Sequence, residues 1–304
     1  MIAMNRNENP SEDKRDAAPF RMTIAEYRQK WDSAFLLPGE SDNVRSAIRE
    51  LAEYFPAYGA EEIEERFWNA TRLFSEYWMR RPPDAKSERS LIDFYNSTDL
   101  EIFELMHYHG VLRDEGPLNY VCALDLAERL GCRDVLDYGS GAGSGGLLFA
   151  KAGLAVTLCD VSLPLLEFAR WRFRKRAREA EFIDLRTGRL ATRADLITCF
   201  EVLEHAPDPL LILRKCREVL RDGGYLILTA PFGKDPERPM HIIHDPRLKL
   251  KFRAQGFEIR RDLKAQVRNR CHEPFFVLQK VNRPFAGNLA CLIGDFYLRG
   301  IVGA

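Results

Sequence analysis

The segment 135–143, which reads VLDYGSGAG, constrains the fold of this chain more than any other. Its first residues suit a buried strand, its glycines suit a tight turn, and the stretch that follows, GGLLFAKAG, is typical of a helix. Glycine permits unusual backbone angles and lets a ligand approach the main chain closely. The free N–H groups at the start of a helix can bind that ligand. The segment therefore predicts a strand–turn–helix cofactor loop, with a purely structural turn as the alternative.

Short apolar runs alternate with helical segments over the remainder of the chain. The runs that we expect to form strands are 134–139, 155–160, 181–185, 194–200 and 224–231, followed by 256–261 and 274–280. Strands that alternate with helices predict a parallel sheet covered by helices. A helix that precedes the first strand, over 118–130, is expected to end at Gly131.

The first third of the chain has a different pattern. Residues 1–19 are polar, charged and poor in apolar side chains, which is typical of a disordered tail. Over about 23–108 the apolar residues recur at helical spacing. Within this part, the segment that ends in MHYHG has Ser97 or Thr98 as its expected N-cap and Gly110 as its expected C-cap.

Two acidic residues indicate the kind of ligand that the cofactor loop binds. Asp137 lies two residues before the first glycine, where a carboxylate suits the ammonium of an amino-acid moiety. Asp160 ends the second expected strand, where a carboxylate can bind both hydroxyls of an adenosine ribose. The spacing of Gly141, Gly143 and Gly146 also fits the GxGxxG pattern of dinucleotide-binding oxidoreductases. That competing interpretation is weakened by Asp137, because the dinucleotide fold favours a small or apolar residue there.

Four motifs give the chain a family resemblance: DYGSGAG, CDVS, DLITCFEVLEHAPDP and LRDGGYLILTAPF. On these motifs, residues 118–280 resemble a class I, Rossmann-like S-adenosylmethionine-dependent methyltransferase. They are similar to the group that contains ubiquinone-biosynthesis O-methyltransferases and many small-molecule methyltransferases. The resemblance implies an α/β fold with a seven-stranded, mostly parallel sheet, an antiparallel last strand, and helices on both faces. It also implies S-adenosylmethionine as the cofactor.

The resemblance assigns roles to individual residues of this chain. It places the methionine part of the cofactor on the glycine turn, the ribose at the end of the second strand, and the sulfonium at the end of the fourth. An acid after the third strand is expected to bind the adenine amino group. The expected cofactor-binding residues are Asp137, Gly139, Ser140 and Gly141 for the methionine part, Asp160 for the ribose, Val161 and Asp184 for the adenine, and Phe200 and Glu201 for the sulfonium.

The motif EVLEH supplies the candidate catalytic groups. Methyl transfer from a sulfonium requires positioning and exclusion of water, and an oxygen or nitrogen acceptor also has to lose a proton. His205 is the leading candidate base and Glu201 the second catalytic candidate, with a loop-bracing role for His205 as the alternative. Glu201, Glu204 and His205 with His241 and His244 also resemble a set that related small-RNA and ubiquinone-pathway methyltransferases use to hold a divalent metal. We assign no metal ligand from the sequence and keep this variant open.

The region before the cofactor loop is long enough to form a cap over the active site. Tyr95, His107, Tyr108, His109 and Tyr120 lie near its end and are expected either to line the acceptor pocket or to pack in a core. We therefore expect a disordered tail over 1–19, an N-terminal helical cap and acceptor-binding region over 20–117, a methyltransferase domain over 118–282 and a C-terminal tail over 283–304.

Charge and cysteine content narrow the expected partners and compartment. Lys and Arg total 45, as do Asp and Glu, so no net charge draws the chain to nucleic acid. We interpret the basic run over 170–178 as a solvated helix face and regard nucleic acid as the less favoured partner. The scattered cysteines, the polar N-terminus and the absence of a long apolar run predict a cytoplasmic protein with no membrane span.

The sequence thus predicts an enzyme that moves a methyl group from S-adenosylmethionine to an oxygen or nitrogen of a small-molecule acceptor. Two other functions fit the same residues. One is a non-catalytic scaffold that binds adenosine or S-adenosylmethionine on the same fold, and the other is an RNA methyltransferase.

Overall fold

The computed structural model describes residues 22–233, 235, 238–268, 270–284, 287, 288 and 290. The expected tail over 1–19 lies outside these residues, as does 291–304, the larger part of the expected C-terminal tail. None of the described helices combines the length and the apolarity that a membrane span requires.

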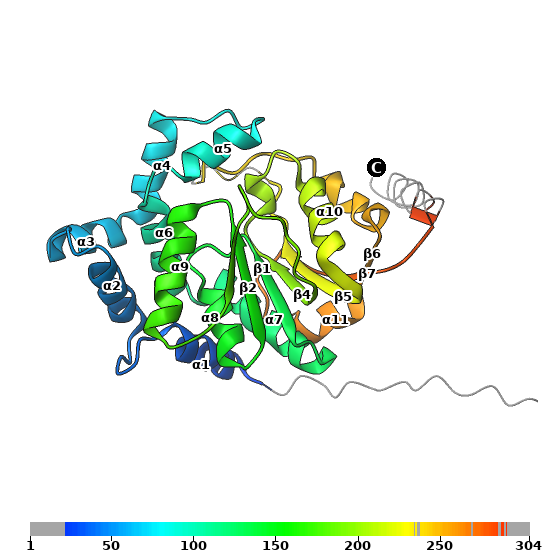
Figure 1. The fold of residues 1–304 in the computed structure, drawn as a ribbon, viewed down its shortest axis with the longest axis horizontal. Coiled ribbons are helices and arrows are strands. Elements are labelled where there is room, and N and C mark those ends of the chain that lie inside the picture. Colours follow the sequence, from blue (N-terminus) through cyan, green and yellow to red (C-terminus); the bar gives the residue numbers. More distant parts are fainter. Residues whose placement is uncertain are drawn as a thin grey trace, which may run out of the picture.

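A seven-stranded sheet forms the centre of the molecule (Figure 1). Its order is β3-β2-β1-β4-β5-β7-β6, and β7 runs antiparallel to both of its neighbours, β5 and β6. The other neighbouring pairs are parallel. The predicted α/β class and the antiparallel last strand are therefore confirmed. The strands are β1 Asp134–Tyr138, β2 Ala155–Asp160, β3 Glu181–Asp184, β4 Ala194–Cys199, β5 Leu220–Thr229, β6 Phe257–Ile259 and β7 Phe275–Lys280.

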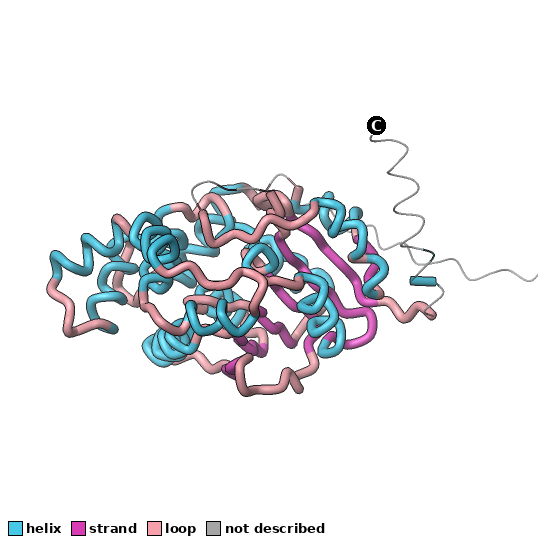
Figure 2. Tube along the Cα trace, turned by 90° about the horizontal axis from the view of Figure 1, so that it is seen from above, coloured by secondary structure: helices cyan, strands magenta, loops and turns pink. Residues whose placement is uncertain are grey.

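Helices cover both faces of this sheet, and Figure 2 shows the strands running between them. Side chains alternate between the faces of a strand, so Val135 and Leu196 join the hydrophobic cluster of one face while Leu136 and Ile197 join that of the other. The first cluster includes apolar residues of α7, α8, α9 and α11, and the second includes those of α10. These helices are α7 Gly116–Leu130, α8 Ser144–Lys151, α9 Leu163–Lys175, α10 Pro209–Val219 and α11 Arg261–Val267.

Six helices precede this α/β unit, and they divide into two groups. They are α1 Ile24–Phe35, α2 Asn43–Tyr54, α3 Ala60–Trp68, α4 Ala70–Arg80, α5 Glu88–Tyr95 and α6 Leu100–Val111. The first three pack beside the sheet unit, with α1 against α7 and α8, and α2 against α6 and α9. By contrast, α4 and α5 share a small cluster that includes Phe74, Phe94 and Met240, and α5 docks on the end of β2 through hydrogen bonds from Asn96 to Val161 and from Leu163 to Asn96.

The expected caps of α6 are wrong. The helix has Asp99 as its N-cap, and it continues through Gly110 to Val111. Gly110 is buried against Asn43 and Ala47 of α2, so the absence of a side chain serves the packing of two helices and does not end one. The expected end of α7 is confirmed, since Gly131 has φ +68° in the left-handed conformation.

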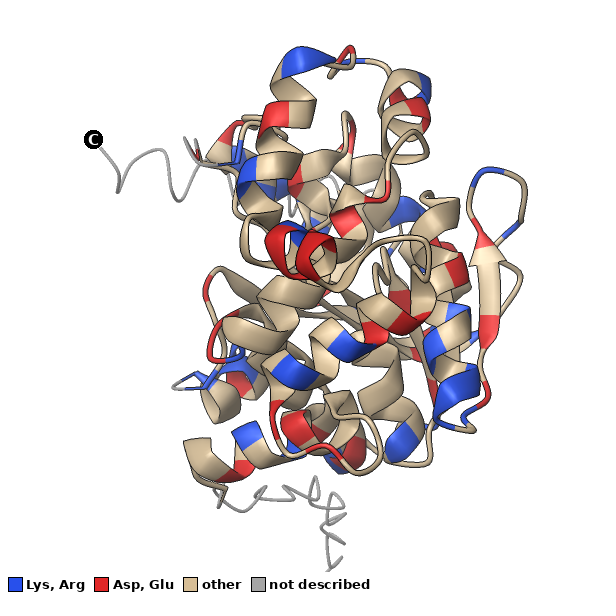
Figure 3. Ribbon diagram, turned by 90° about the vertical axis from the view of Figure 1, so that its left-hand side faces the viewer, with Lys and Arg blue, Asp and Glu red and all other residues tan. Residues whose placement is uncertain are grey.

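The basic run over 170–178 is only partly a solvated face. Arg170, Arg174 and Arg178 are exposed, and Lys, Arg, Asp and Glu are interspersed over the side of the molecule in Figure 3. Arg172, however, is 0% exposed and forms an ion pair with the equally buried Glu50 of α2 at 3.1 Å. Its guanidinium also donates to the Ala142 carbonyl at 2.8 Å and to the Ser144 hydroxyl at 2.7 Å. The pair thus ties the N-terminal helices to the glycine turn.

Candidate active site

A cavity of about 420 Å³ opens at the carboxyl ends of β1, β2 and β4. This is the edge at which open parallel sheets bind ligands. One wall comes from the glycine turn and the strand ends, with Gly139, Ser140, Gly141, Asp160, Val161 and Phe200. The opposite wall comes from α4, α5 and α6, with Phe74, Leu91, Tyr95, Glu101, Leu105 and Tyr108. The N-terminal helices that precede the sheet in sequence therefore enclose the space above it.

The glycine turn has the backbone that its sequence favours. Gly139, Gly141 and Gly143 have φ values of +70°, +51° and +73°, which lie in the left-handed region. A Cβ on Gly141 would lie 2.7 Å from Cδ1 of Leu105 on α6. The turn needs glycine both for its backbone angles and for the close approach of α6.

Asp160 is held in place by the turn. Its two carboxylate oxygens accept hydrogen bonds from the backbone N–H groups of Gly141 and Ser162, both at 2.9 Å. Burial raises the pKa of Asp160, and these N–H groups oppose the rise by stabilising the charged form. The carboxylate is 7% exposed and faces the cavity. Its position and remaining lone pairs suit a ligand hydroxyl.

Asp137 lies behind the turn and does not line the cavity, in contrast to the sequence expectation. It is 0% exposed and accepts a hydrogen bond from the Thr198 hydroxyl at 2.7 Å, while its Oδ2 has no hydrogen-bond partner. Burial raises the pKa of Asp137 to about 7. Asp137 is therefore held by the neighbouring strand beneath the turn, and its contact with the methionine part stays a prediction.

Asp184 also lies outside the cavity. The Arg186 guanidinium pairs with its carboxylate at 2.7 Å, and this hydrogen bond lowers the pKa of Asp184. The next residue, Leu185, lines the cavity in its place. The short segment after β3 thus places Asp184 beside Arg186, and its contact with adenine stays a prediction.

The end of β4 carries a strained residue. Glu201 has φ +53°, although it is not glycine. Its backbone N–H donates to the Thr229 hydroxyl at 2.8 Å, and that hydroxyl donates to Oε1 of Glu201 at 2.9 Å. Phe200 lies edge-on to Tyr120, with ring centroids 4.8 Å apart. Phe200 and Glu201 both line the cavity, where the sequence expected them to flank a sulfonium.

His205 is held by a residue of the N-terminal region. The Tyr95 hydroxyl lies 2.9 Å from Nδ1 of His205. Burial, together with the neighbouring His241 and Arg238, lowers the pKa of His205 to about 3, and burial lowers that of His241 to about 4. Both imidazoles are therefore neutral at physiological pH, and each has a nitrogen lone pair that can accept a hydrogen bond or bind a metal.

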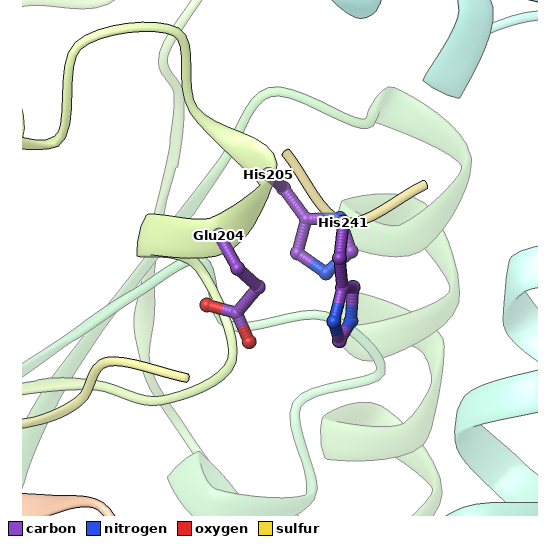
Figure 4. A group of neighbouring side chains, drawn as sticks. All are labelled: Glu204, His205 and His241. Carbon is purple, nitrogen blue, oxygen red and sulfur yellow. The ribbon is translucent and has the colours of Figure 1, made fainter. Parts of the chain in front are cut away.

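Glu204 completes a group of three possible metal ligands with His205 and His241 (Figure 4). One ligand atom from each lies within 4.8 Å of the others. Glu204 is 0% exposed, and neither of its carboxylate oxygens has a hydrogen-bond partner. Burial and the neighbouring Glu201 raise the pKa of Glu204 well above its usual range. A buried carboxylate without a donor beside two neutral imidazoles fits a divalent cation. His244 is not part of this group.

Sequence reasoning missed several cavity residues, among them Glu101 and Glu104 of α6 and Arg238 of the loop after β5. The two acids are three residues apart and are surrounded by apolar residues of α6. Residues at this spacing lie on one face of a helix, so the sequence could have indicated a polar stripe on α6. Nothing in the sequence around Arg238 indicates that this residue lines a cavity. It lines the cavity because the loop folds back, with the Ile242 N–H donating to the Glu204 carbonyl at 2.7 Å.

Comparisons with known proteins agree with this architecture. Residues 136–226 match the family described as "Methyltransferase domain". A ubiquinone biosynthesis O-methyltransferase of Vibrio parahaemolyticus is 34% identical over 132 residues, which are 42% of this chain and 54% of that protein. The enzyme of the same name from Bordetella avium is 33% identical over 144 residues, 46% of this chain and 59% of that protein. The chain thus spans about half the length of these curated relatives.

One solved structure supports the fold over a longer part of the chain. An O-methyltransferase family protein from Burkholderia thailandensis superposes with a TM-score of 0.50 at 14% identity and covers 72% of each chain. This likeness bears on the fold alone. The domain match over residues 136–226 agrees with the predicted resemblance to S-adenosylmethionine-dependent methyltransferases, and the order of the strands agrees with the Rossmann-like fold that the resemblance implies.

Proposed function

We propose that this chain, which carries a methyltransferase domain, transfers a methyl group from S-adenosylmethionine to an oxygen or nitrogen of a small-molecule acceptor. The observation that carries the proposal is the joining of two sites in one cavity. The glycine turn and Asp160 form its cofactor end, and His205 with Tyr95 lies in the same space. A scaffold that only binds the cofactor has no need of the His205–Tyr95 pair.

The reaction is a displacement at the methyl carbon. A lone pair of the acceptor oxygen or nitrogen forms the new bond to carbon while the bond from carbon to sulfur breaks. S-adenosylhomocysteine leaves as a neutral thioether, and the acceptor loses one proton. The enclosed cavity holds the reactants in line and excludes water, which accounts for most of what the protein has to supply.

In this proposal His205 receives the acceptor proton as the new bond to carbon forms, when the acceptor group becomes strongly acidic. Its imidazole is neutral, faces the cavity and is oriented by Tyr95 at Nδ1, which leaves Nε2 for the acceptor. Glu201 flanks the sulfonium from the end of β4, where its carboxylate favours positive charge.

The test of the function is release of S-adenosylhomocysteine when the chain is given S-adenosylmethionine and a panel of small phenols, alcohols and amines. Binding of the cofactor without release for any acceptor would favour the scaffold.

We expect Asp160→Ala to weaken binding of S-adenosylmethionine and of S-adenosylhomocysteine alike. Loss of a charge-assisted hydrogen bond to the ribose should cost about 1–3 kcal/mol, measured by isothermal titration calorimetry. The matched control is Asp184→Ala, which removes an acid that lies outside the cavity and should leave affinity within about twofold. Unchanged affinity in Asp160→Ala, in a protein that remains folded, would remove this residue from the site.

We expect Tyr95→Phe to lower turnover about tenfold while cofactor affinity stays the same. The substitution removes the hydroxyl that orients His205, which is worth about one buried hydrogen bond. Tyr77→Phe is the control, since the Tyr77 hydroxyl contacts only Ser97 on the outside of the cap. The measurement is kcat and cofactor dissociation constant for each variant. A parallel fall in cofactor affinity would show that Tyr95 shapes the cofactor site instead.

A divalent cation is a second candidate ligand for the part of the cavity beside His205. Glu204, His205 and His241 would hold it, and a bound cation would favour the deprotonated form of an acceptor hydroxyl. An imidazole nitrogen that binds a metal cannot take a proton, so this role of His205 excludes the role as base at that nitrogen.

Equilibrium dialysis against Mn²⁺ or Zn²⁺ separates the two roles. We expect Glu204→Gln to weaken ion binding at least about tenfold, because it removes the only charged ligand of the set. His244→Gln should have no effect, since His244 is not part of the group. Absence of stoichiometric ion binding by the unmodified chain would leave His205 as the base.

We also propose a cytoplasmic location and a partner that is not nucleic acid. The cysteines of the described residues are free, five of them buried, which suits a reducing compartment. The basic side chains of α9 are divided between a buried ion pair and an exposed surface of mixed charge. An RNA methyltransferase would require a continuous basic surface.

A further inference from the structure

The cavity has a second acidic wall that the proposed function does not use. Glu101 and Glu104 of α6 line it opposite Asp160 and Glu201, which stand at the ends of β2 and β4. Residues three apart lie on one face of a helix. Leu105, on the same helix, approaches Gly141 of the cofactor turn, so this face of α6 lies directly over the cofactor site.

Few positive charges compensate these acids. Oε2 of Glu101 is buried and has no hydrogen-bond partner. Among the described lining residues the basic ones are Arg238 and, at the rim, the exposed Lys86 and the half-buried Lys215. Arg238 acts on Glu104, Glu201 and Asp235 at once, so one guanidinium faces several acids. Lys215 pairs with the rim residue Glu88 at 3.6 Å. The inner cavity is therefore acidic.

The carboxyl groups of the two walls lie close enough to affect one another. Burial and the charges of Asp160 and Glu104 raise the pKa of Glu101 well above its usual range. Burial also raises the pKa of Glu104, with Arg238 opposing the rise and Glu201 adding to it. A cation placed between the walls would stabilise the charged form of each acid and be stabilised by it in return.

We propose that Glu101 and Glu104 of α6 select the positively charged methyl donor over the neutral thioether product. The inference rests on the proposed function. S-adenosylmethionine carries one more positive charge than S-adenosylhomocysteine, and that charge is on the sulfur, near the end of β4. Once the donor is bound, its sulfonium favours the ionised form of the two acids, and their charge stabilises the donor in return. When the methyl group leaves, the sulfur loses its charge, and the product loses this attraction.

The test compares three ligands by isothermal titration calorimetry in the presence of EDTA, so that no metal contributes. S-adenosylmethionine and sinefungin carry a positive charge at or near the sulfur position, whereas S-adenosylhomocysteine does not. We expect Glu101→Gln and Glu104→Gln each to weaken the two cationic ligands about tenfold and to change the neutral one less than twofold. The control is Glu88→Gln, the same substitution at the exposed rim, which should change none of the three.

Equal losses for all three ligands, or no loss for the cations, would overturn the inference while leaving the proposed function intact. Failure of the unmodified chain to bind any of the three would overturn the proposed function and the inference with it. Glutamine matches the shape of a protonated glutamate, so both variants should keep the unfolding temperature of the unmodified chain. Should either one unfold, the other carries the comparison alone.

Discussion

The variant Gly141→Val should lose detectable binding of S-adenosylmethionine. Gly141 has φ +51°, where a β-branched residue is strained by about 1–3 kcal/mol. Its Cβ would lie 2.7 Å from Leu105, and its methyl groups would occupy the space that the ligand needs over the turn. The backbone N–H that donates to Asp160 would shift as well. We expect affinity to fall by more than about a hundredfold, as the sum of these effects.

Gly153→Val is a matched control for this experiment. Gly153 has φ +85° and nothing within 4 Å of its Cβ position, so the substitution strains the backbone without touching the cavity. Backbone strain should lower the stability of both variants in urea unfolding, and Gly141→Val should lose more because of its contact with Leu105. Only Gly141→Val should lose the cofactor in calorimetry. Native affinity in Gly141→Val would mean that the turn is purely structural.

The variant Arg172→Met should lower the free energy of unfolding by about 3 kcal/mol. Arg172 and Glu50 are both 0% exposed, and removal of one partner leaves a buried charge that water cannot reach. Arg176 also pairs with Glu50, which limits the loss to the lower part of the usual range. The Ala142 carbonyl and the Ser144 hydroxyl would lose a donor too. Because Ala142 belongs to the glycine turn, cofactor affinity should fall in the same variant.

Arg174→Met provides the matched control, since Arg174 is exposed two residues away on the same helix. It should change the free energy of unfolding by no more than about 0.5 kcal/mol. The double variant Glu50→Leu with Arg172→Met should be more stable than the sum of the single effects predicts, because neither Arg172 nor Glu50 is left without the other. Arg176 loses Glu50 in this variant but keeps its hydrogen bond to the Phe35 carbonyl. Additive losses would show that the two side chains do not act as a pair.

Local sequence determined the elements of the fold and the cofactor end of the cavity. The glycines of the turn, Gly131 at the end of α7 and the apolar strand runs report on backbone angles and on side-chain alternation. These properties depend on neighbours within a few residues, so the sequence alone predicted the sheet, the turn and the position of Asp160. The same reasoning identified His205 as a cavity residue.

Only the tertiary structure decided which distant side chains meet. Tyr95 reaches His205 across 110 residues, and Glu50 reaches Arg172 across 122. A run of basic residues does not reveal which of them is buried, because burial depends on which helix packs over it.

The acidic wall shows most clearly what the sequence alone cannot predict. In the sequence, Glu101 and Glu104 are two acids in an apolar helix, and nothing nearby distinguishes a solvated stripe from a ligand-facing one. Their role depends on the crossing of α6 over the cofactor turn, which is set by the packing of α6 on α2 and α9. Local interactions therefore determined the elements and the turn, while the charge of the cavity was decided by packing between segments far apart in the chain.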